Sequence, residues 1–185
     1  MSDLRIAVVI ASTREGRLGD QVGEWVFEQA KDRDASYELI DLKAERLPIF
    51  DSAKSPGMGY YQDDTVKAWG EKIASFDGFI FVTPEYNHAI PAPLKNAIDL
   101  LGPDWNNKSC AFVGYGGLGG ARAIENLRAI AGFIGLADVS QTLTFTLFGD
   151  FKDFSKFTPV EQNVPAAQTM FDQVEAWAGA LKPLR

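Results

Sequence analysis

The sequence has few of the residues that carry covalent or metal chemistry, with one cysteine and one histidine among 185 residues. The single cysteine, Cys110, excludes an internal disulfide, and its apolar neighbours indicate packing in a chain compatible with a reducing compartment. The single histidine, His88, lies in a polar loop, where a lone histidine is more often a neighbour of a site than a catalyst. We therefore predict no catalytic acid–base residue and no metal ligand set.

Long apolar runs are also missing, because no stretch approaches the 18 residues that a membrane-spanning helix needs. The chain opens with Ser2-Asp3 and no basic segment, unlike a secretory signal peptide. Basic residues are outnumbered, 18 Lys and Arg against 25 Asp and Glu, for a formal net charge of −7. This balance argues against a nucleic-acid or membrane-surface partner, although a bound phosphate needs only local donors. We expect a cytoplasmic protein.

The chain does contain enough apolar residues, 46% of the total, to build a sizeable core. Its length suits one domain over residues 1–185, and we find neither repeats nor low-complexity tracts. A continuous apolar run at residues 79–83 is typical of a strand that is buried on both faces of a parallel sheet. Pro84 must end this strand, because proline has no N–H to donate to a neighbouring strand.

Polar side chains follow that strand at its carboxyl end, where open α/β sheets bind their ligands: Glu85, Tyr86 and Asn87. From Ala92 the apolar spacing changes to that of a helix, with Leu94, Ala97, Ile98 and Leu101 on one side and Pro93 in the first turn. Strand, polar loop and helix together form half of a predicted binding crevice.

A second polar loop follows the first predicted strand, residues 4–11, and runs from Ser12 to Asp20. It leads into a helix with Val22, Val26 and Ala30 on one face, for which Gly19 or Asp20 would be the N-cap. Free backbone N–H groups and the positive end of the helix dipole make such a loop a cradle for an anion. Arg14 and Arg17 add positive charge. The loop lacks the Gly-Lys-Ser/Thr of a nucleotide-hydrolysing P-loop, so we predict no hydrolysis.

The remaining pattern alternates strands and helices. Strands are predicted at residues 37–42, 109–114 and 137–142, and helices around residues 66–76, 123–131 and 164–181. Residues 43–64 form a long irregular loop, a length that is usually functional or mobile. This alternation predicts an α/β fold with a parallel sheet.

A glycine-rich loop follows the strand at residues 109–114, and it satisfies the G-x-G-x-x-G pattern of dinucleotide-binding folds. That fingerprint normally follows the first strand of its unit and needs an acid at the end of the next strand, whereas Asp138 stands near the start of its strand. Glycines without a Cβ instead let backbone N–H groups approach the edge of a planar ring. We favour this second use for Tyr115, Gly116 and Gly117.

The two motifs after residue 82 resemble the NAD(P)H-dependent FMN reductase family of flavodoxin-like proteins. They are Thr83-Pro84-Glu85-Tyr86-Asn87 and Pro93-Leu94-Lys95-Asn96-Ala97-Ile98-Asp99, and they keep their spacing across the loop. The resemblance implies a flavodoxin-like three-layer α/β sandwich with a five-stranded parallel sheet of order 2-1-3-4-5. It also implies bound FMN, with its phosphate on the loop after the first strand and its ring beside the other two loops.

By this resemblance we expect the FMN phosphate to be held by Ser12, Arg14, Gly19, Asp20, Gln21 and Val22. Asp20 would act through its backbone, because its carboxylate would repel a phosphate. The ring would lie beside Pro84, Glu85, Tyr86, Asn87, Tyr115, Gly116 and Gly117.

The implied function is an oxidoreductase in which FMN takes hydride from NADPH or NADH and reduces a small acceptor. Free flavin, quinones, azo compounds and metal oxyanions would all suit a shallow flavin face. A flavodoxin-type electron carrier without its own pyridine nucleotide site is the alternative, and the arginines of the first loop favour the reductase. A third possibility is an interaction protein that keeps the fold without flavin, which a visible spectrum of the purified protein would identify.

An aromatic-rich segment at residues 143–162 has no counterpart in these motifs. Its phenylalanines recur almost every third residue, at positions 145, 148, 151, 154 and 157. Exposed aromatics on that scale usually mark an interface. Because members of the resembled family pair through helices beside the flavin, we predict a homodimer or a dimer of dimers. Tyr60, Tyr61 or residues 145–157 would lie close to the partner's flavin.

Overall fold

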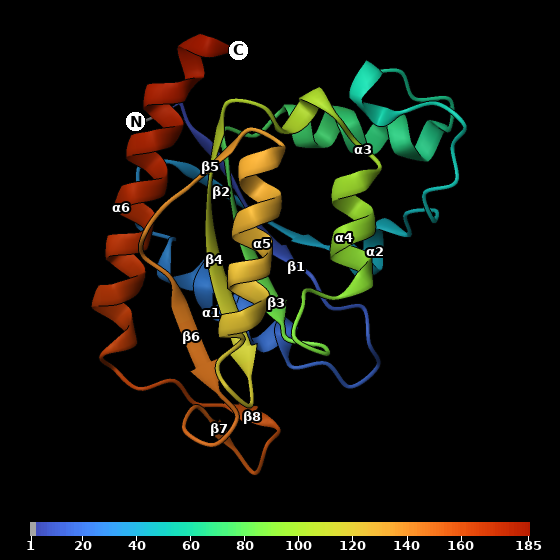
Figure 1. Ribbon diagram of the computed structural model, residues 1–185. Helices are drawn as coiled ribbons and strands as arrows, with labels where there is room; N and C mark the ends of the chain where they lie inside the picture. Colours follow the sequence, from blue (N-terminus) through green and yellow to red (C-terminus); the bar gives the residue numbers. More distant parts are fainter. Residues whose placement is uncertain (1–2) are drawn as a thin grey trace.

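A parallel β-sheet runs through the centre of the computed structural model, which describes residues 3–185 (Figure 1). Its main strands are β1 (Arg5–Ile10), β2 (Ser36–Asp41), β3 (Gly78–Pro84), β4 (Lys108–Gly116) and β5 (Leu136–Asp138). They lie side by side in the order β2-β1-β3-β4-β5, which confirms the predicted flavodoxin-like sheet. The strands β1 to β4 are parallel, so their carboxyl ends point the same way, and those of β3 and β4 lie at the lower end of the molecule in Figure 1; β5 ends earlier, opposite the start of β4.

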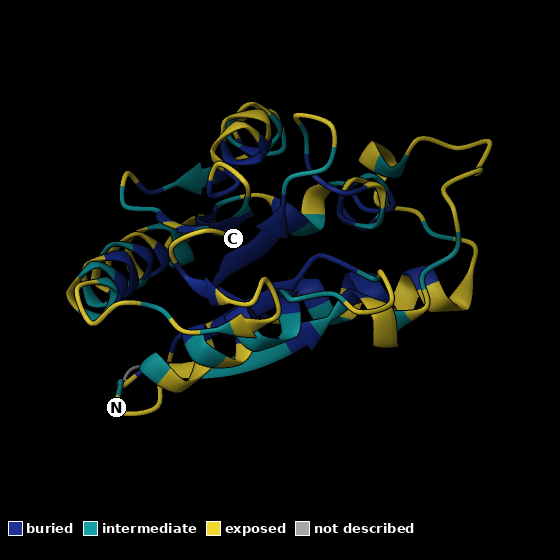
Figure 2. Cartoon of the chain, turned by 90° about the horizontal axis from the view of Figure 1, so that it is seen from below, coloured by how far each residue is buried: buried dark blue, intermediate teal, exposed yellow. Residues whose placement is uncertain are grey.

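Helices cover both faces of the sheet and complete a three-layer sandwich. They are α1 (Gly19–Gln29), α2 (Leu42–Glu45), α3 (Asp64–Ala74), α4 (Ala92–Asp99), α5 (Ala121–Phe133) and α6 (Asn163–Leu181), with short 3₁₀ turns η1 (Pro56–Met58), η2 (Pro103–Trp105) and η3 (Lys182–Leu184). Seen onto the carboxyl edge, the buried strands lie between amphipathic helices whose outer faces are exposed (Figure 2). Burial on both sides explains the unbroken apolar composition of β3, in which every residue is buried.

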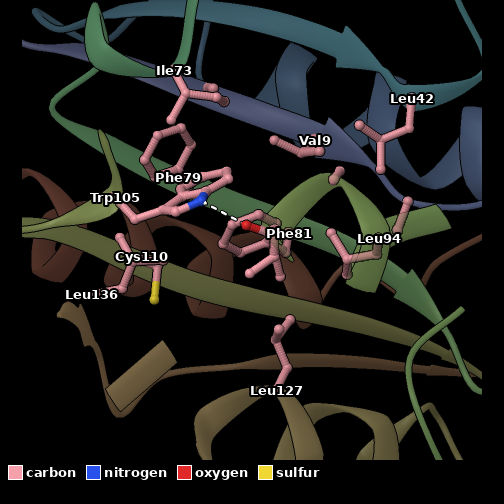
Figure 3. Close-up of a cluster of buried hydrophobic side chains, with 14 of the residues drawn as sticks. Val9, Leu42, Ile73, Phe79, Phe81, Leu94, Trp105, Cys110, Leu127 and Leu136 are labelled. Atoms are coloured by element: carbon pink, nitrogen blue, oxygen red, sulfur yellow. Dashed lines mark hydrogen bonds between the residues drawn. The ribbon is translucent and has the colours of Figure 1, made fainter. Parts of the chain in front are cut away.

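Alternate residues of the strands enter two separate cores. On one face, Phe79, Phe81 and Phe112 pack with side chains from α3, α4 and α5, and Trp105 closes against Phe79 at 5.0 Å between ring centroids (Figure 3). On the other face, Ile80 and its neighbours pack with α1 and α6. The period-two alternation of strand side chains divides the sheet in this way.

The fifth strand position differs from the prediction of one strand over residues 137–142. Two short strands occupy it: β5 pairs with the start of β4, and β6 (Leu143–Thr146) pairs with its end, residues 113–116. The reason is the length of β4, which continues beyond the predicted end at Gly114 to Gly116. The chain leaves the sheet after Asp138 and returns at Leu143, where β6 pairs with the extended end of β4.

The aromatic segment is largely an internal feature, contrary to the prediction that its aromatics are exposed. Phe145 and Phe151 are buried, and Phe157 is partly buried against the Trp25 and Phe145 rings. A small hairpin, β7 (Phe151–Lys152) and β8 (Lys156–Phe157), folds them onto the domain. Of the five phenylalanines, Phe148 and Phe154 remain exposed, by 79% and 60%. Most phenylalanines of this segment are therefore explained by burial in the core of the same domain.

Within residues 3–185, no helix is both long enough and apolar enough to cross a bilayer.

Candidate functional site

The loops after β1, β3 and β4 converge at the carboxyl edge of the sheet, as the sequence predicts for a flavodoxin-like fold. They enclose an open cavity of ≈ 220 Å³. It is lined by Arg14, Arg17, Leu18, Pro84, Glu85, Tyr86, Tyr115, Gly116, Gly117 and Leu147. The structure thus brings together one predicted residue of the first loop, three of the second and all three of the third.

Ser12 connects the first two loops. Its side chain is fully buried, and its hydroxyl shares a hydrogen bond with the Tyr86 hydroxyl at 2.8 Å. The Arg14 backbone N–H also donates to the Ser12 Oγ at 3.4 Å, so this serine shapes the start of the loop. Its buried position two residues after β1 suits a small hydroxyl residue.

The amino terminus of α1 differs from the prediction in one respect. The N-cap residue is Leu18, not Gly19 or Asp20, and no side chain caps the helix. Asp20 lies in the first turn, where its carboxylate accepts the Gln21 backbone N–H at 3.0 Å. The Val22 N–H donates to the Leu18 carbonyl at 3.3 Å, so the first-turn N–H groups left without an acceptor within residues 3–185 are those of Gly19 and Asp20. Such a helix end is suited to an anion.

The two arginines of the first loop have different roles. Arg17 donates two hydrogen bonds to the Asp41 carboxylate, each at 2.6 Å, and a third to the Ser12 carbonyl at 2.7 Å. The hydrogen bonds from Arg17 outweigh burial and hold the pKa of Asp41 below its usual value. Arg17 therefore lines the cavity with a guanidinium whose charge is largely balanced by Asp41 at the end of β2. Arg14 is exposed, and its side chain has no hydrogen bond or ion pair within residues 3–185.

Two further predicted phosphate residues face away from the cavity. The Gln21 side chain donates to the Ser155 carbonyl at 2.8 Å and accepts the Phe157 N–H at 2.9 Å, so it fastens the β7–β8 hairpin to α1. The Val22 side chain is fully buried in the core. Their backbone N–H groups are also engaged, by the Asp20 carboxylate and the Leu18 carbonyl.

The second loop is fixed from both ends. Glu85 accepts the Arg122 backbone N–H at 3.2 Å and forms an ion pair with the Arg122 side chain at the start of α5. Burial alone would raise the pKa of Glu85, but the hydrogen bonds and charge of Arg122 lower it overall. This pair ties the loop after β3 to the helix after β4. The Glu85 carboxylate therefore has a structural partner.

A tight turn completes the second loop. Tyr86 and Ala89 exchange backbone hydrogen bonds at 3.0 and 3.1 Å, and the central residues Asn87 and His88 have φ of 50° and 69°. Positive φ at both central positions is the signature of a type I′ turn, which non-glycine residues adopt at some cost. Asn87 is exposed and does not line the cavity. Its role here is to form the turn that carries Tyr86.

The third loop begins inside the sheet, because Tyr115 and Gly116 belong to β4. Gly116 has φ of 149°, and a Cβ on Gly117 would meet nothing within 4 Å, so backbone is open to the cavity here. The Tyr115 hydroxyl points to the start of α1, where a Cβ on Gly19 would lie 2.5 Å from it. Burial raises the pKa of this phenol and the nearby Ser12 hydroxyl lowers it in part, while the phenol oxygen makes no hydrogen bond of normal geometry within residues 3–185.

Sequence reasoning missed the residues that hold the loops in place. The Arg17–Asp41 and Glu85–Arg122 pairs join positions 24 and 37 residues apart. Leu147, which lines the cavity, follows β6, a strand that was not predicted. The acid that ends β2 and the arginine that starts α5 were visible in the sequence, but nothing there indicated their partners.

The start of α1 and the open backbone of Gly116 and Gly117 border one cavity at the carboxyl edge, where flavodoxin-like sheets bind their ligands. The model of the NADPH-dependent FMN reductase family matches residues 4–150. The chain belongs to this family, which is a family of oxidoreductases, and the family resemblance of its motifs is thereby confirmed.

Proteins with similar sequences are named as FMN reductases or quinone reductases. An NAD(P)H-dependent FMN reductase of Schizosaccharomyces pombe is 43% identical over 133 residues, covering 70% of this chain and 66% of that protein. An NAD(P)H-dependent FMN reductase of a Nectria species is 32% identical over 185 residues, covering 96% and 89%. A quinone reductase of Escherichia coli is 33% identical over 138 residues, covering 71% of each.

Solved structures agree on the fold. The flavoenzyme NAD(P)H:(acceptor) oxidoreductase FerB of Paracoccus denitrificans superposes with a TM-score of 0.74 over 96% of this chain and 98% of that chain. Its sequence is 22% identical, so this likeness shows the flavodoxin-like architecture alone.

Proposed function

We propose that the chain binds FMN in the cavity between the three loops, accepts hydride from NADPH or NADH, and reduces a small acceptor such as a quinone or free flavin. The observation that carries the proposal is the buried Tyr115 hydroxyl, which points without a partner to the uncapped start of α1. A buried hydroxyl that makes no hydrogen bond costs about 1–3 kcal/mol. A phosphate at this helix end would offer it an acceptor.

The residues present fit one terminal phosphate and a planar ring. The backbone N–H groups of Gly19 and Asp20 and the exposed Arg14 would hold the phosphate, because the Gln21 and Val22 N–H groups already donate to the Asp20 carboxylate and the Leu18 carbonyl. Gly116 and Gly117 would present backbone N–H groups to the ring edge, and Pro84, Glu85 and Tyr86 would form the opposite wall. The flavin itself supplies hydride acceptance and electron transfer, so the protein has only to bind and orient it.

Heat-released flavin tests the cofactor, and anaerobic mixing tests the activity. We expect FMN in the supernatant, bleaching of the bound flavin by NADPH or NADH, and recovery of its colour on addition of a benzoquinone. Release of FAD, or no flavin binding at micromolar concentration, would overturn the proposal. A protein that binds FMN but is not reduced by either nucleotide would instead be a flavodoxin-type electron carrier.

We further propose a homodimer or dimer of dimers, a single flavin-binding domain, and a cytoplasmic location. Exposed apolar side chains support the first: Met58 and Tyr60 are 76% and 55% exposed, and Phe148 and Phe154 pack on each other at 5.5 Å in solvent. The buried free thiol of Cys110 is compatible with the proposed cytoplasmic location. Light scattering over a dilution series, with activity measured on the same samples, tests the assembly. A fully active monomer at micromolar concentration would refute it.

A further inference from the structure

A nearly buried carboxylate belongs to the wall of the cavity between the three loops, which we call the flavin cavity. Glu85 lines this cavity, and its side chain is 7% exposed. It lies against the glycine-rich loop, because a Cβ on Gly116 would be 3.8 Å from the Glu85 Cβ. In the proposed function, the backbone of Gly116 faces the edge of the flavin ring. Glu85 therefore brings a formal negative charge into the wall beside the ring, where little water screens it.

Arg122 of α5 balances this charge. Its side chain forms an ion pair with the Glu85 carboxylate, and its backbone N–H donates to the same carboxylate at 3.2 Å. Arg122 is the second residue of α5, so the carboxylate also lies at the positive end of that helix. His88 acts on the carboxylate in the same direction when it is protonated. One carboxylate is thus offset by a guanidinium and by a helix dipole.

The backbone holds both partners of this pair in place. A Cβ on Gly120, the N-cap of α5, would lie 2.7 Å from the Tyr115 backbone nitrogen, so the start of the helix packs directly on β4. Glu85 follows the last residue of β3. Because β3 and β4 are neighbouring strands, the position of Arg122 relative to Glu85 is set by the sheet.

We propose that Glu85 and Arg122 set the reduction potential of the bound FMN, and that Arg122 raises this potential by balancing the Glu85 carboxylate. The inference rests on the proposed function. A hydride brings two electrons and one proton, so reduced FMN carries one more negative charge than oxidised FMN. Charge near the ring nitrogens tunes the electronics of a flavin. An unbalanced carboxylate in the cavity wall would therefore disfavour the reduced form and lower the potential.

The two charges of the pair differ in exposure, which predicts effects of different size. The Arg122 side chain is 43% exposed, whereas that of Glu85 is 7% exposed. Removing Arg122 leaves a charge in surroundings of low dielectric constant, and removing Glu85 leaves a charge that water screens. We expect R122Q to lower the potential by more than E85Q raises it. The potential of E85Q/R122Q should lie close to that of the wild type, because this double variant removes both charges.

The test measures the midpoint potential of FMN in the wild type and in these three variants, by dye-coupled reduction at about pH 8, where an unperturbed histidine is neutral. A unit charge in a partly buried site changes a binding constant about tenfold. R122Q should therefore bind reduced FMN about tenfold more weakly relative to oxidised FMN, which for a two-electron couple is a fall of about 30 mV. R122K keeps the charge and should keep the potential of the wild type.

The matched control is R128Q, which removes another arginine of α5 that pairs with a carboxylate. Its partner, Asp138, lies opposite Cys110, near the end of β4 that is remote from Gly116. The potential of R128Q should equal that of the wild type. A shift in R128Q as large as that in R122Q would overturn the inference, because any loss of an ion pair on this helix would then have the same effect.

The potential also separates an electrostatic role from a structural one. E85Q and R122Q both remove the tie between the second loop and α5, so both should lower the unfolding temperature of the flavin-free protein. A structural role alone would weaken the binding of oxidised and reduced FMN equally, or shift both potentials in the same direction, and either result would overturn the inference. Shifts of opposite sign, with the potential restored in the double variant, would support it.

Two outcomes distinguish this inference from the proposed function. A wild type that binds no FMN would overturn both. A wild type that binds FMN and is reduced by NADPH or NADH, with an unchanged potential in R122Q, would overturn the inference alone. If R122Q does not retain FMN, E85Q decides the question by itself, because a potential equal to or below that of the wild type would contradict the role of its carboxylate.

Discussion

Replacing each arginine of the first loop in turn should separate ligand binding from loop stability. The variants are R14Q and R17Q, which remove the same charge three residues apart. Arg17 and Asp41 have side chains that are 12% and 30% exposed, and they form a bidentate pair. Breaking a fully buried pair costs about 3–5 kcal/mol and an exposed pair contributes about 0–1 kcal/mol. For this half-buried pair we expect R17Q to lower the free energy of unfolding by about 2 kcal/mol.

Arg14 should show the opposite behaviour. It is exposed and its side chain has no partner, so R14Q should change stability by no more than about 0.5 kcal/mol. If its guanidinium binds the FMN phosphate, R14Q should raise the Kd for FMN about tenfold or more. Thermal unfolding of the flavin-free protein and fluorescence titration with FMN measure the two quantities on the same samples.

The pH dependence provides a second check on Arg17. The folded-state pKa of Asp41 is lowered, so the stability that its pairing contributes is present above the unfolded pKa and is lost as pH falls through the folded value. The difference in the free energy of unfolding between the wild type and R17Q should therefore become smaller below about pH 4. A full loss of FMN affinity in R17Q without a loss of stability would show that Arg17 is a phosphate ligand, and our reasoning would be refuted.

Three further outcomes are expected. Y115F should stabilise the flavin-free protein by about 1 kcal/mol, since it removes an unpaired buried hydroxyl, and should weaken FMN binding; a destabilised apoprotein would contradict this. G117A should fold normally, whereas G114A should unfold at lower temperature, because its Cβ would lie 2.5 Å from the Gly119 carbonyl oxygen; equal melting temperatures would refute the contrast. Burial lowers the pKa of Lys108 from 10.5 to about 8, so this residue disfavours folding most below pH 8. Between pH 8 and 10.5, the free energy of unfolding of the wild type should rise by about 3 kcal/mol relative to that of K108M. An equal pH dependence of the two proteins would refute the lowered pKa of Lys108.

The sequence predicted the strands that are buried on both faces most reliably. The run at residues 79–83 is apolar throughout because α1 and α6 cover one face and α3, α4 and α5 cover the other. Proline has no N–H to donate, so the sequence also indicated that this strand ends at Pro84 and that the second loop begins there. The sheet order and the convergence of the three loops then followed from the fold class.

Features that depend on contacts between distant segments were not predictable. Leu18 is the N-cap although local capping preference favours Gly19 or Asp20, and the adjacent Arg17 is held by Asp41 at the end of β2. Gln21 was expected to bind a phosphate, but its side-chain amide forms hydrogen bonds to the backbone of the β7–β8 hairpin, more than 130 residues away in the sequence. The alternation of buried and exposed phenylalanines in residues 145–157 depends on the same hairpin.

Helix α6 lies beyond the family match, which ends at residue 150, yet it closes one face of the sheet. Met170, Phe171 and Val174 are fully buried there, and the Ser109 hydroxyl of β4 donates to the Val174 carbonyl at 2.9 Å. During synthesis every strand of the sheet leaves the ribosome before α6 does. Until α6 emerges, the apolar surface that α6 covers on this face stays exposed, so the nascent chain is prone to aggregation. The native fold can therefore form only after α6 has emerged, although all three ligand loops are made before it.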